Sequence, residues 1–273
     1  MGSRILSTVI LWAIVAGCVL FLGPTGGVWL VTIVAVLTLR EFYALIRHLD
    51  IDPFDRFGMT IGAVLCLGPL YLAPHGVPVK AVLALAVIVF AIRILGERKA
   101  HERLDTLAWT AFGVIYIPFM LQFLSQVMLI DTPLPKTGLL LSVWLIAVSK
   151  FCDVGALLAG MMFGKHKLAP EISPKKTWEG AIGGVLTSMG IGAGLAHGFG
   201  DAVPAAFTPW FAAAMAVPVA VLAIVSDLVE SIVKRRTNAK DAGRTIPGIG
   251  GVFDLSDSLI LTAPLGYVIF SLL

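Results

Sequence analysis

Long apolar runs, separated by short polar connections, follow one another along almost the whole chain. A helix needs about 20 mainly apolar residues to cross the hydrocarbon core of a bilayer. Runs of roughly that length occur at nine places, with ends uncertain by a few residues: 5–22, 27–46, 57–73, 78–96, 107–128, 138–161, 180–199, 210–233 and 257–273. The pattern predicts an all-α, polytopic integral membrane protein with about nine transmembrane helices. The third and the last run are short, and either is compatible with a re-entrant segment.

The composition supports a membrane protein. Of the 273 residues, 58% are hydrophobic and 14% are charged, whereas soluble domains carry about 25% charged residues. No polar stretch is long enough to fold as a soluble domain. We therefore expect a single membrane domain over 1–273, in which 1–135 contributes N-terminal spans and 136–273 contributes the spans and loops of the candidate site.

Basic residues gather on one side of the predicted membrane domain. With nine spans, the N-terminus and the connections after the second, fourth, sixth and eighth spans share one side, which carries fifteen Lys and Arg residues. The opposite side carries two, Lys80 and Lys136. Since an excess of Lys and Arg marks the cytoplasmic side, we expect the N-terminus and the basic loops to face the cytoplasm.

Ionisable residues interrupt three of the apolar runs. A charged side chain at the bilayer centre costs roughly 2.5–3.5 kcal/mol on insertion scales, so such residues point to a function or a structural tie. In each run or at its edge, these residues and one serine recur at spacings that place them on one helix face: Lys150 and Asp153; Asp227, Glu230, Ser231 and Lys234; and Asp254 and Asp257.

These charges also have a structural interpretation, as helix-end charges near the headgroups or as salt bridges that tie helices together. We favour that interpretation for Arg40 and Glu41. For Lys150 both interpretations stay open.

Three carboxylates have a weaker structural explanation. Asp227, Asp254 and Asp257 are expected to converge at the same ends of adjacent spans, beside the most basic loop. Carboxylates that close repel one another, and a bound divalent cation removes the repulsion. Hard oxygen ligands of this kind suit Mg²⁺. We therefore predict a Mg²⁺ site formed by these three residues.

The loop after the sixth run, FGKHKLAPEISPKKTWEG, places Lys175 and Lys176 just before a predicted helix N-terminus. This arrangement suits an anionic ligand such as phosphate. Taken alone, two lysines before a membrane helix more often serve as a cytoplasmic anchor or contact anionic lipids. His166 has no neighbouring ligand residue and is interpreted as a surface residue.

The segment after the eighth run, KRRTNAKDAGRTIPGIGGVFDLSD, combines three kinds of residue that suit a nucleotide polyphosphate. It has basic residues that pair with phosphates, glycines that allow close backbone approach, and carboxylates that can hold a bridging cation: Lys234, Arg235 and Lys240; Gly243, Gly248, Gly250 and Gly251; and Asp241, Asp254 and Asp257. It is not a Walker motif. These residues indicate metal-dependent phosphate chemistry at the cytoplasmic membrane surface.

The same residues form the pattern S-x-x-K-R-x4-K-D-x-G followed by P-x-x-G-G-V-x-D-x-x-D, from Ser231 to Asp257. The pattern resembles the signature of the phosphatidate cytidylyltransferases, or CDP-diacylglycerol synthases. The upstream segment CDVGALLAGMMFGKHKLAPEISPKKTWEGAIGG is similar to the same family, and the strong match covers about 150–262. The chain departs from the usual pattern at Ile249, where the family often has His, and at Leu255, where it often has Arg.

The resemblance implies that a phosphate oxygen of phosphatidic acid attacks the α-phosphorus of CTP. Pyrophosphate then leaves, and CDP-diacylglycerol remains in the membrane. It implies one set of residues that act in this reaction: Lys176, Asp227, Ser231, Lys234, Lys240, Asp241 and Asp254. It implies a second set that binds substrate: Asp153, Lys175, Glu179, Arg235, Gly250 and Gly251. Mg²⁺, with or without a second cation, is expected on Asp227, Asp254 and Asp257.

The expected partners are CTP, phosphatidic acid, the lipid bilayer and a second copy of the chain, with no nucleic acid. The expected location is the inner, cytoplasmic membrane, with the active site facing the cytoplasm. Two alternatives remain. One is a CTP-dependent transferase that acts on another lipid phosphate, and the other is an ion transporter that uses the intramembrane carboxylates. The crowding of charges at one end of the spans favours an enzyme.

Overall fold

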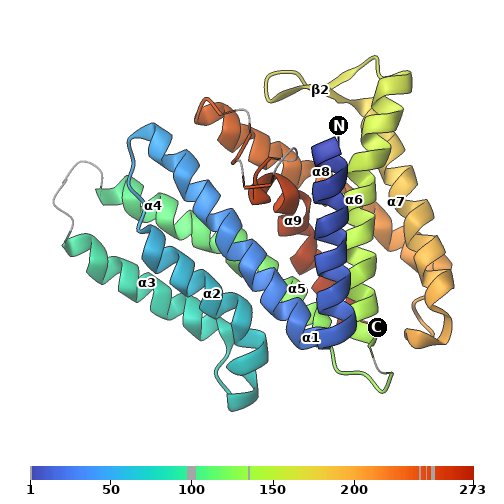
Figure 1. Ribbon diagram of the computed structural model, residues 1–273, viewed down its shortest axis with the longest axis horizontal. Coiled ribbons are helices and arrows are strands. Elements are labelled where there is room, and N and C mark those ends of the chain that lie inside the picture. The colour runs from blue at the N-terminus through green and yellow to red at the C-terminus, as the bar shows by residue number, and fades with distance from the viewer. Residues whose placement is uncertain (1, 97–102, 135, 240, 244, 247–249) are drawn as a thin grey trace. The chain divides into compact units, whose positions relative to one another are not determined.

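Helices form almost all of the protein (Figure 1). The computed structural model describes residues 2–96, 103–134, 136–239, 241–243, 245–246 and 250–273. Its helices are α1 (Gly2–Ile46), α2 (Asp55–Tyr71), α3 (Val79–Leu95), α4 (Arg103–Val114), α5 (Met120–Met128), α6 (Thr137–Phe163), α7 (Trp178–Phe199), α8 (Pro209–Arg236) and α9 (Val252–Phe270). The prediction of an all-α membrane protein is confirmed, with one small addition. The loop after α6 forms an antiparallel hairpin of strands β1 (Lys167–Ala169) and β2 (Ser173–Thr177).

Among the described residues, six helical segments are long and apolar enough to cross a bilayer: Phe21–Leu49, Arg103–Met128, Thr137–Phe163, Trp178–Ala202, Pro209–Arg236 and Val252–Phe270. Helices α2 and α3 have 17 residues each, which corresponds to about 25 Å, against a hydrocarbon core of about 30 Å. The run predicted at 5–22 falls mostly on residues whose side chains lie outside the description. The predicted number of nine spans is therefore not confirmed.

Helix α1 has a sharp kink between the first two predicted runs. Gly23 has φ 59° and ψ −147°, outside helical geometry, and Pro24 follows it. Positive φ is readily adopted only by glycine, and proline cannot donate a helical hydrogen bond. These two residues explain why the backbone changes direction here.

The chain forms two compact units, each described by itself. The first unit contains Met1–Ser125 and Val233–Ser256. Its helices pack around the buried Tyr43, whose hydroxyl donates to the carbonyl of Thr110 at 2.9 Å. A Cβ at Gly58 or Gly113 would come within 3 Å of the Tyr43 side chain. The two glycines therefore allow α2 and α4 to approach the tyrosine on α1.

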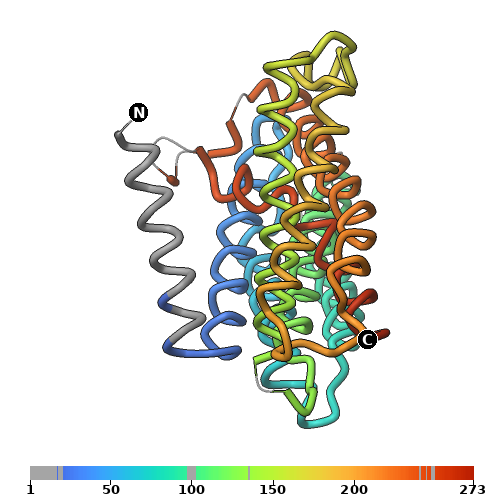
Figure 2. The backbone as a smooth tube through the Cα atoms, turned by 90° about the vertical axis from the view of Figure 1, so that its right-hand side faces the viewer, coloured from blue at the N-terminus to red at the C-terminus, as the bar shows by residue number. Residues whose placement is uncertain are grey.

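The second unit contains Gln126–Ile232 and Asp257–Leu273. In it α6 and α7 run side by side, and the hairpin connects them (Figures 1 and 2). Small residues lie at their contact: a Cβ on Gly155 would lie 2.3 Å from Oγ1 of Thr187, and one on Gly183 would lie 2.2 Å from Cβ of Ala159. Such residues let membrane helices pack closely. The prediction of a single membrane domain stays a prediction.

Candidate active site

A cluster of three carboxylates lies in the second unit. Asp227 and Glu230, one turn apart on α8, and Asp257 on α9 each offer an oxygen atom, and these oxygens all lie within 4.8 Å of one another. Glu230 and Asp257 are buried, whereas Asp227 is half-buried. The Ser226 hydroxyl donates a hydrogen bond to the backbone carbonyl of Asp257, which ties α8 to α9 beside the cluster.

Two lysines compensate the charge of this cluster. Nζ of Lys176, on β2, lies 2.5 Å from Oδ2 of Asp227. Nζ of Lys150, on α6, lies 3.3 Å from Oδ1 of Asp257 and 3.9 Å from Oδ2 of Asp153. Partly buried carboxylates require such compensation because uncompensated charges are costly away from water. Lys150, for which the sequence left two interpretations open, contacts two of the candidate site residues.

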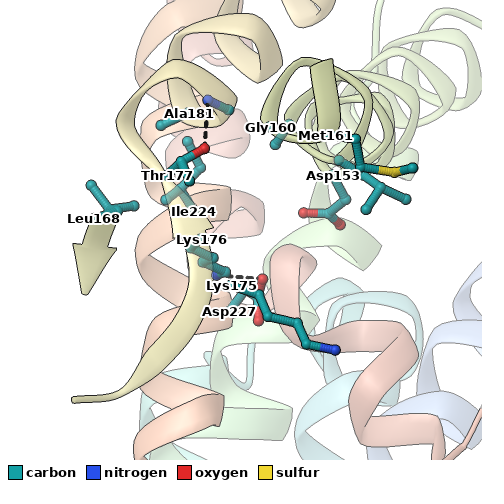
Figure 3. A pocket seen from close by; sticks show the side chains of 13 residues that line it. Asp153, Gly160, Met161, Leu168, Lys175, Lys176, Thr177, Ala181, Ile224 and Asp227 are labelled. Atoms are coloured by element: carbon teal, nitrogen blue, oxygen red, sulfur yellow. Dashed lines mark hydrogen bonds and ion pairs between the residues drawn. The ribbon is translucent and has the colours of Figure 1, made fainter. Parts of the chain in front are cut away.

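A cavity of about 320 Å³ opens beside this cluster. Figure 3 shows Asp153 on α6, Lys175 and Lys176 on β2 and Asp227 on α8 around it. Apolar side chains complete the lining: Ala156, Leu157, Met161, Leu168, Ala181 and Ile224. A cavity that combines ammonium and carboxylate groups with apolar walls suits an amphiphile that carries a phosphate.

The hairpin holds Lys176 in this cavity. Thr177 pairs with Lys167 in the hairpin and its hydroxyl accepts from the Gly180 amide at 3.1 Å, which caps α7. The carboxylate of Glu179 accepts from the amides of Lys165 and His166 at 3.1 and 3.2 Å, and its Oε1 lies 2.5 Å from Nδ1 of His166. Glu179, predicted to bind substrate, therefore fixes the loop before β1 and is not among the described residues that line the cavity.

Asp254, in the first unit, has a different environment. Its Oδ1 accepts from Nζ of Lys234 at 2.8 Å. Its Oδ2 accepts from the amides of Gly251 at 2.8 Å and Ala242 at 3.0 Å. Because α9 begins at Val252, the bond from Gly251 joins the residue before the helix to its third residue, as in a capping box. Both oxygens of this predicted metal ligand thus accept hydrogen bonds from protein donors.

The glycine pair beside Asp254 is explained by the backbone. Gly250 has φ 131°, which strongly favours glycine, and it forms an isolated bridge with Ile246 through hydrogen bonds of 2.9 and 3.1 Å. A Cβ at Gly250 would lie 2.9 Å from Oδ2 of Asp254. Glycine at position 250 allows this turn to lie against the Asp254 carboxylate.

The remaining predicted site residues lie at the end of α8 and just after it. Ser231 is half-buried in α8, Arg235 is exposed in its last turn, and Asp241 is exposed after the helix. Lys240 and Ile249 lie outside the described residues. Leu255 is half-buried in the first turns of α9.

The cluster can be tested for its fit to Mg²⁺. The ion binds oxygen atoms at 2.0–2.1 Å in octahedral geometry, so opposite ligands are about 4.2 Å apart. Oxygens of Asp227, Glu230 and Asp257 within 4.8 Å of one another are close to this spacing. The donor set is made of hard oxygens, which Mg²⁺ prefers. These three residues therefore fit the ion, with small side-chain adjustments.

Residues 2–273 match the model of the cytidylyltransferase family. The chain belongs to this family. A phosphatidate cytidylyltransferase of Brucella suis is 33% identical over 268 residues, which cover 96% of this chain and 92% of that protein.

Further members of the family resemble parts of the chain. The phosphatidate cytidylyltransferase of Mycobacterium bovis is 32% identical over 182 residues, 65% of this chain and 55% of its own length. That of Haemophilus influenzae is 34% identical over 154 residues, 56% of this chain and 53% of its own. The resemblance inferred from the signature is thus confirmed at the level of the family.

Three residues that lie beside predicted site residues were not themselves predicted to belong to the site: Glu230, Lys150 and Glu41. Glu230 follows Asp227 by three residues on α8, so helical spacing alone could have added it to the cluster. The sequence singled out Lys150 as a charge within an apolar run, three residues before Asp153, but did not assign it to the site. Glu41 was interpreted as a structural tie, and its contacts agree: it accepts from Thr245 and from the amide of Phe253.

Proposed function

We propose that the protein is a phosphatidate cytidylyltransferase. It transfers CMP from CTP to phosphatidic acid and forms CDP-diacylglycerol and pyrophosphate. A phosphate oxygen of the lipid forms a bond to the α-phosphorus of CTP, and the bond from that phosphorus to the bridging oxygen of pyrophosphate breaks. The family match over residues 2–273 carries the proposal, and the amphiphilic cavity beside the carboxylate cluster supports it.

The side chains of the cavity have complementary tasks in this reaction. Lys175 and Lys176 bind phosphate oxygens from β2, and the apolar wall that includes Leu157 and Met161 accommodates acyl chains near the glycerol. No protein nucleophile is needed, because positioning and charge stabilisation suffice for this class of transfer. Lys176 must then exchange part of its contact with Asp227 for the substrate phosphate.

We propose Mg²⁺ as the cofactor, held by Asp227, Asp257 and Glu230. When bound, the ion neutralises triphosphate charge and stabilises the leaving pyrophosphate. Lys150 keeps Asp257 oriented from α6 through the 3.3 Å contact. Asp254 was predicted as a third ligand, but we assign it to capping the start of α9 in the first unit, because both of its oxygens accept hydrogen bonds there.

We propose that the enzyme lies in the cytoplasmic membrane with the site open to the cytoplasm. The excess of Lys and Arg in the connections on that side supports the orientation. CTP then enters from water, and the lipid enters from the bilayer. Assembly as a homodimer is part of the same proposal and rests on the family resemblance.

The experiment is to incubate the purified protein with CTP labelled at the α-phosphate, phosphatidic acid and Mg²⁺. Label is expected in the lipid extract with wild type, and is expected to be lost when metal is chelated or with Asp227→Asn. Asp201→Asn is a matched control, because Asp201 is an exposed carboxylate in the turn after α7.

Each contrary result has a distinct meaning. Labelling that requires another lipid phosphate would show that the substrate is wrong while the transfer chemistry holds. Ion flux in sealed vesicles without labelling would favour a transporter. Equal loss of activity in Asp201→Asn and Asp227→Asn would contradict the proposal that Asp227 binds Mg²⁺.

A further inference from the structure

Glu41 is a buried carboxylate in the membrane-embedded part of α1. It is 8% exposed, and both of its oxygens accept hydrogen bonds from the loop and helix that carry the family signature. The Thr245 hydroxyl donates to Oε1 at 2.5 Å, and the amide of Phe253 donates to Oε2 at 2.8 Å. A buried carboxylate is tolerated only with such donors. These hydrogen bonds therefore connect Glu41 on α1 to Thr245 and to the start of α9.

Two glycines of the signature make room for this carboxylate. A Cβ at Gly243 would lie 2.5 Å from Oε1 of Glu41, and a Cβ at Gly251 would lie 2.3 Å from Oε2. Any larger residue would displace the carboxylate or the loop. Contact with Glu41 on α1 thus explains why glycine occupies these two positions, although Glu41 lies more than 200 residues earlier in the sequence.

Neighbours of Glu41 on the same face of α1 strengthen the contact. Oγ1 of Thr38 lies 2.8 Å from Oγ of Ser256. The rings of Phe42 and Phe253 pack edge to face with centroids 6.1 Å apart. Residues three and four apart share one helix face. Thr38, Glu41 and Phe42 therefore form one surface of α1 against which the start of α9 packs.

The start of α9 lies between two carboxylates. Asp254 accepts from the amide of Gly251, and Glu41 accepts from the amide of Phe253. Amides in the first turn of a helix lack intrahelical partners, and negative charge near them is favourable. The two carboxylates thus fix Gly251 and the first turn of α9, which contains the Asp254 oxygen that pairs with Lys234.

We propose that Glu41 is a positioning residue for nucleotide binding. It holds Thr245 and the start of α9 through its hydrogen bonds to Thr245 and Phe253. Lys234, which pairs with Asp254 in the first turn of α9, is thereby presented to the phosphates of CTP. It does not itself touch substrate. This inference rests on the proposed function for its ligand, whereas the effect of Glu41 on the loop is independent of that function.

The test combines two measurements on the full-length protein. Hydrogen exchange followed by mass spectrometry reports the protection of amides in 241–256, and steady-state kinetics report KM for CTP, KM for the lipid and kcat. Glu41→Ala removes both acceptors, and Thr245→Val removes one donor while keeping the shape of the side chain. Glu41→Gln retains an acceptor for Phe253 and a group that can bond the threonine hydroxyl. Arg40→Gln is the matched control, since Arg40 is the exposed neighbour on α1.

Glu41→Ala is expected to raise exchange in 241–256 and to raise KM for CTP at least about tenfold, because the loss of even one hydrogen bond to a charged group has an effect of this size. Thr245→Val is expected to raise that KM by a smaller factor, and Thr245→Ser to restore it. KM for the lipid is expected to stay within twofold. Arg40→Gln and Glu41→Gln are expected to behave nearly as wild type.

Other outcomes overturn the inference. Unchanged exchange in Glu41→Ala would show that Glu41 does not hold the loop. Raised exchange with an unchanged KM for CTP would show that the loop conformation does not serve nucleotide binding, and a fall in kcat alone would indicate a general loss of folded protein. If wild type transfers no CMP, the proposed function fails, and the exchange data still decide whether Glu41 holds the loop.

Discussion

Nζ of Lys176 lies 2.5 Å from Oδ2 of Asp227. This ion pair connects the hairpin to α8 at the edge of the cavity (Figure 3). Each partner is about a quarter exposed, so the pair is accessible to an incoming ligand but partly shielded from water. The contact places a phosphate-binding group directly beside a candidate metal ligand.

Substitution of Lys176 tests the catalytic use of this pair. Lys176→Met is expected to lower kcat/KM about a hundredfold, in the range seen when one group that stabilises transition-state charge is removed. Lys175→Met is the matched variant, because Lys175 is more exposed and has no ion pair among the described residues. We expect it to cost about tenfold or less. Equal effects of the two variants would contradict a special role for Lys176.

The dependence of activity on Mg²⁺ distinguishes carboxylates that are proposed to bind the ion, Glu230 and Asp257, from Asp254, which is not. Chelation is expected to abolish transfer, and Glu230→Gln and Asp257→Asn are expected to raise the Mg²⁺ concentration for half-maximal rate at least tenfold, because each removes the charge of a proposed ligand. The measurement is a Mg²⁺ titration of the initial rate. Asp254→Asn is expected to leave this midpoint within about twofold while lowering the rate. A shift as large as that of Asp257→Asn would restore Asp254 to the predicted metal site.

Asp254 is expected to stabilise the first unit through its capping bond. Asp254→Ala removes the acceptor for the Gly251 amide, and loss of a helix cap costs about 0.5–2 kcal/mol. We expect a lower midpoint of thermal unfolding in detergent and faster exchange of amides in 250–254. Asp241→Ala is the control on the exposed side of the loop. An unchanged midpoint in Asp254→Ala would show that the capping bond contributes little.

The close contact of α6 and α7 predicts opposite effects of adding one methyl group at two glycines. Gly155→Ala places Cβ 2.3 Å from Oγ1 of Thr187, so we expect destabilisation by about 1–3 kcal/mol, as for overpacked sites. Gly194→Ala on α7 meets nothing within 4 Å and is expected to be neutral or stabilising by up to about 1 kcal/mol, because alanine favours the helix. Thermal unfolding of both variants is the measurement. Equal stabilisation of both variants would indicate that helix propensity, not packing, dominates.

Much of the fold follows from local sequence properties. The apolar runs predicted each of the six helices that, among the described residues, are long and apolar enough to cross a bilayer. Runs near the limiting length were less informative: α2 and α3 formed helices that are short for a full crossing. The hairpin before α7 was not predicted, because its strands have three and five residues and carry no alternating pattern that exceeds the loop signal.

The sequence by itself determined that this is a helical membrane protein of the cytidylyltransferase family, and that acidic and basic side chains recur on single helix faces. Those properties are local: hydropathy fixes the spans, and the helical repeat fixes which residues of one helix lie together. Which faces meet is a property of packing between segments distant in the chain. Only the tertiary structure decided that Glu230 joins Asp227 and Asp257, that Asp254 caps α9 with Lys234 as its partner, and that Glu41 reaches the signature loop.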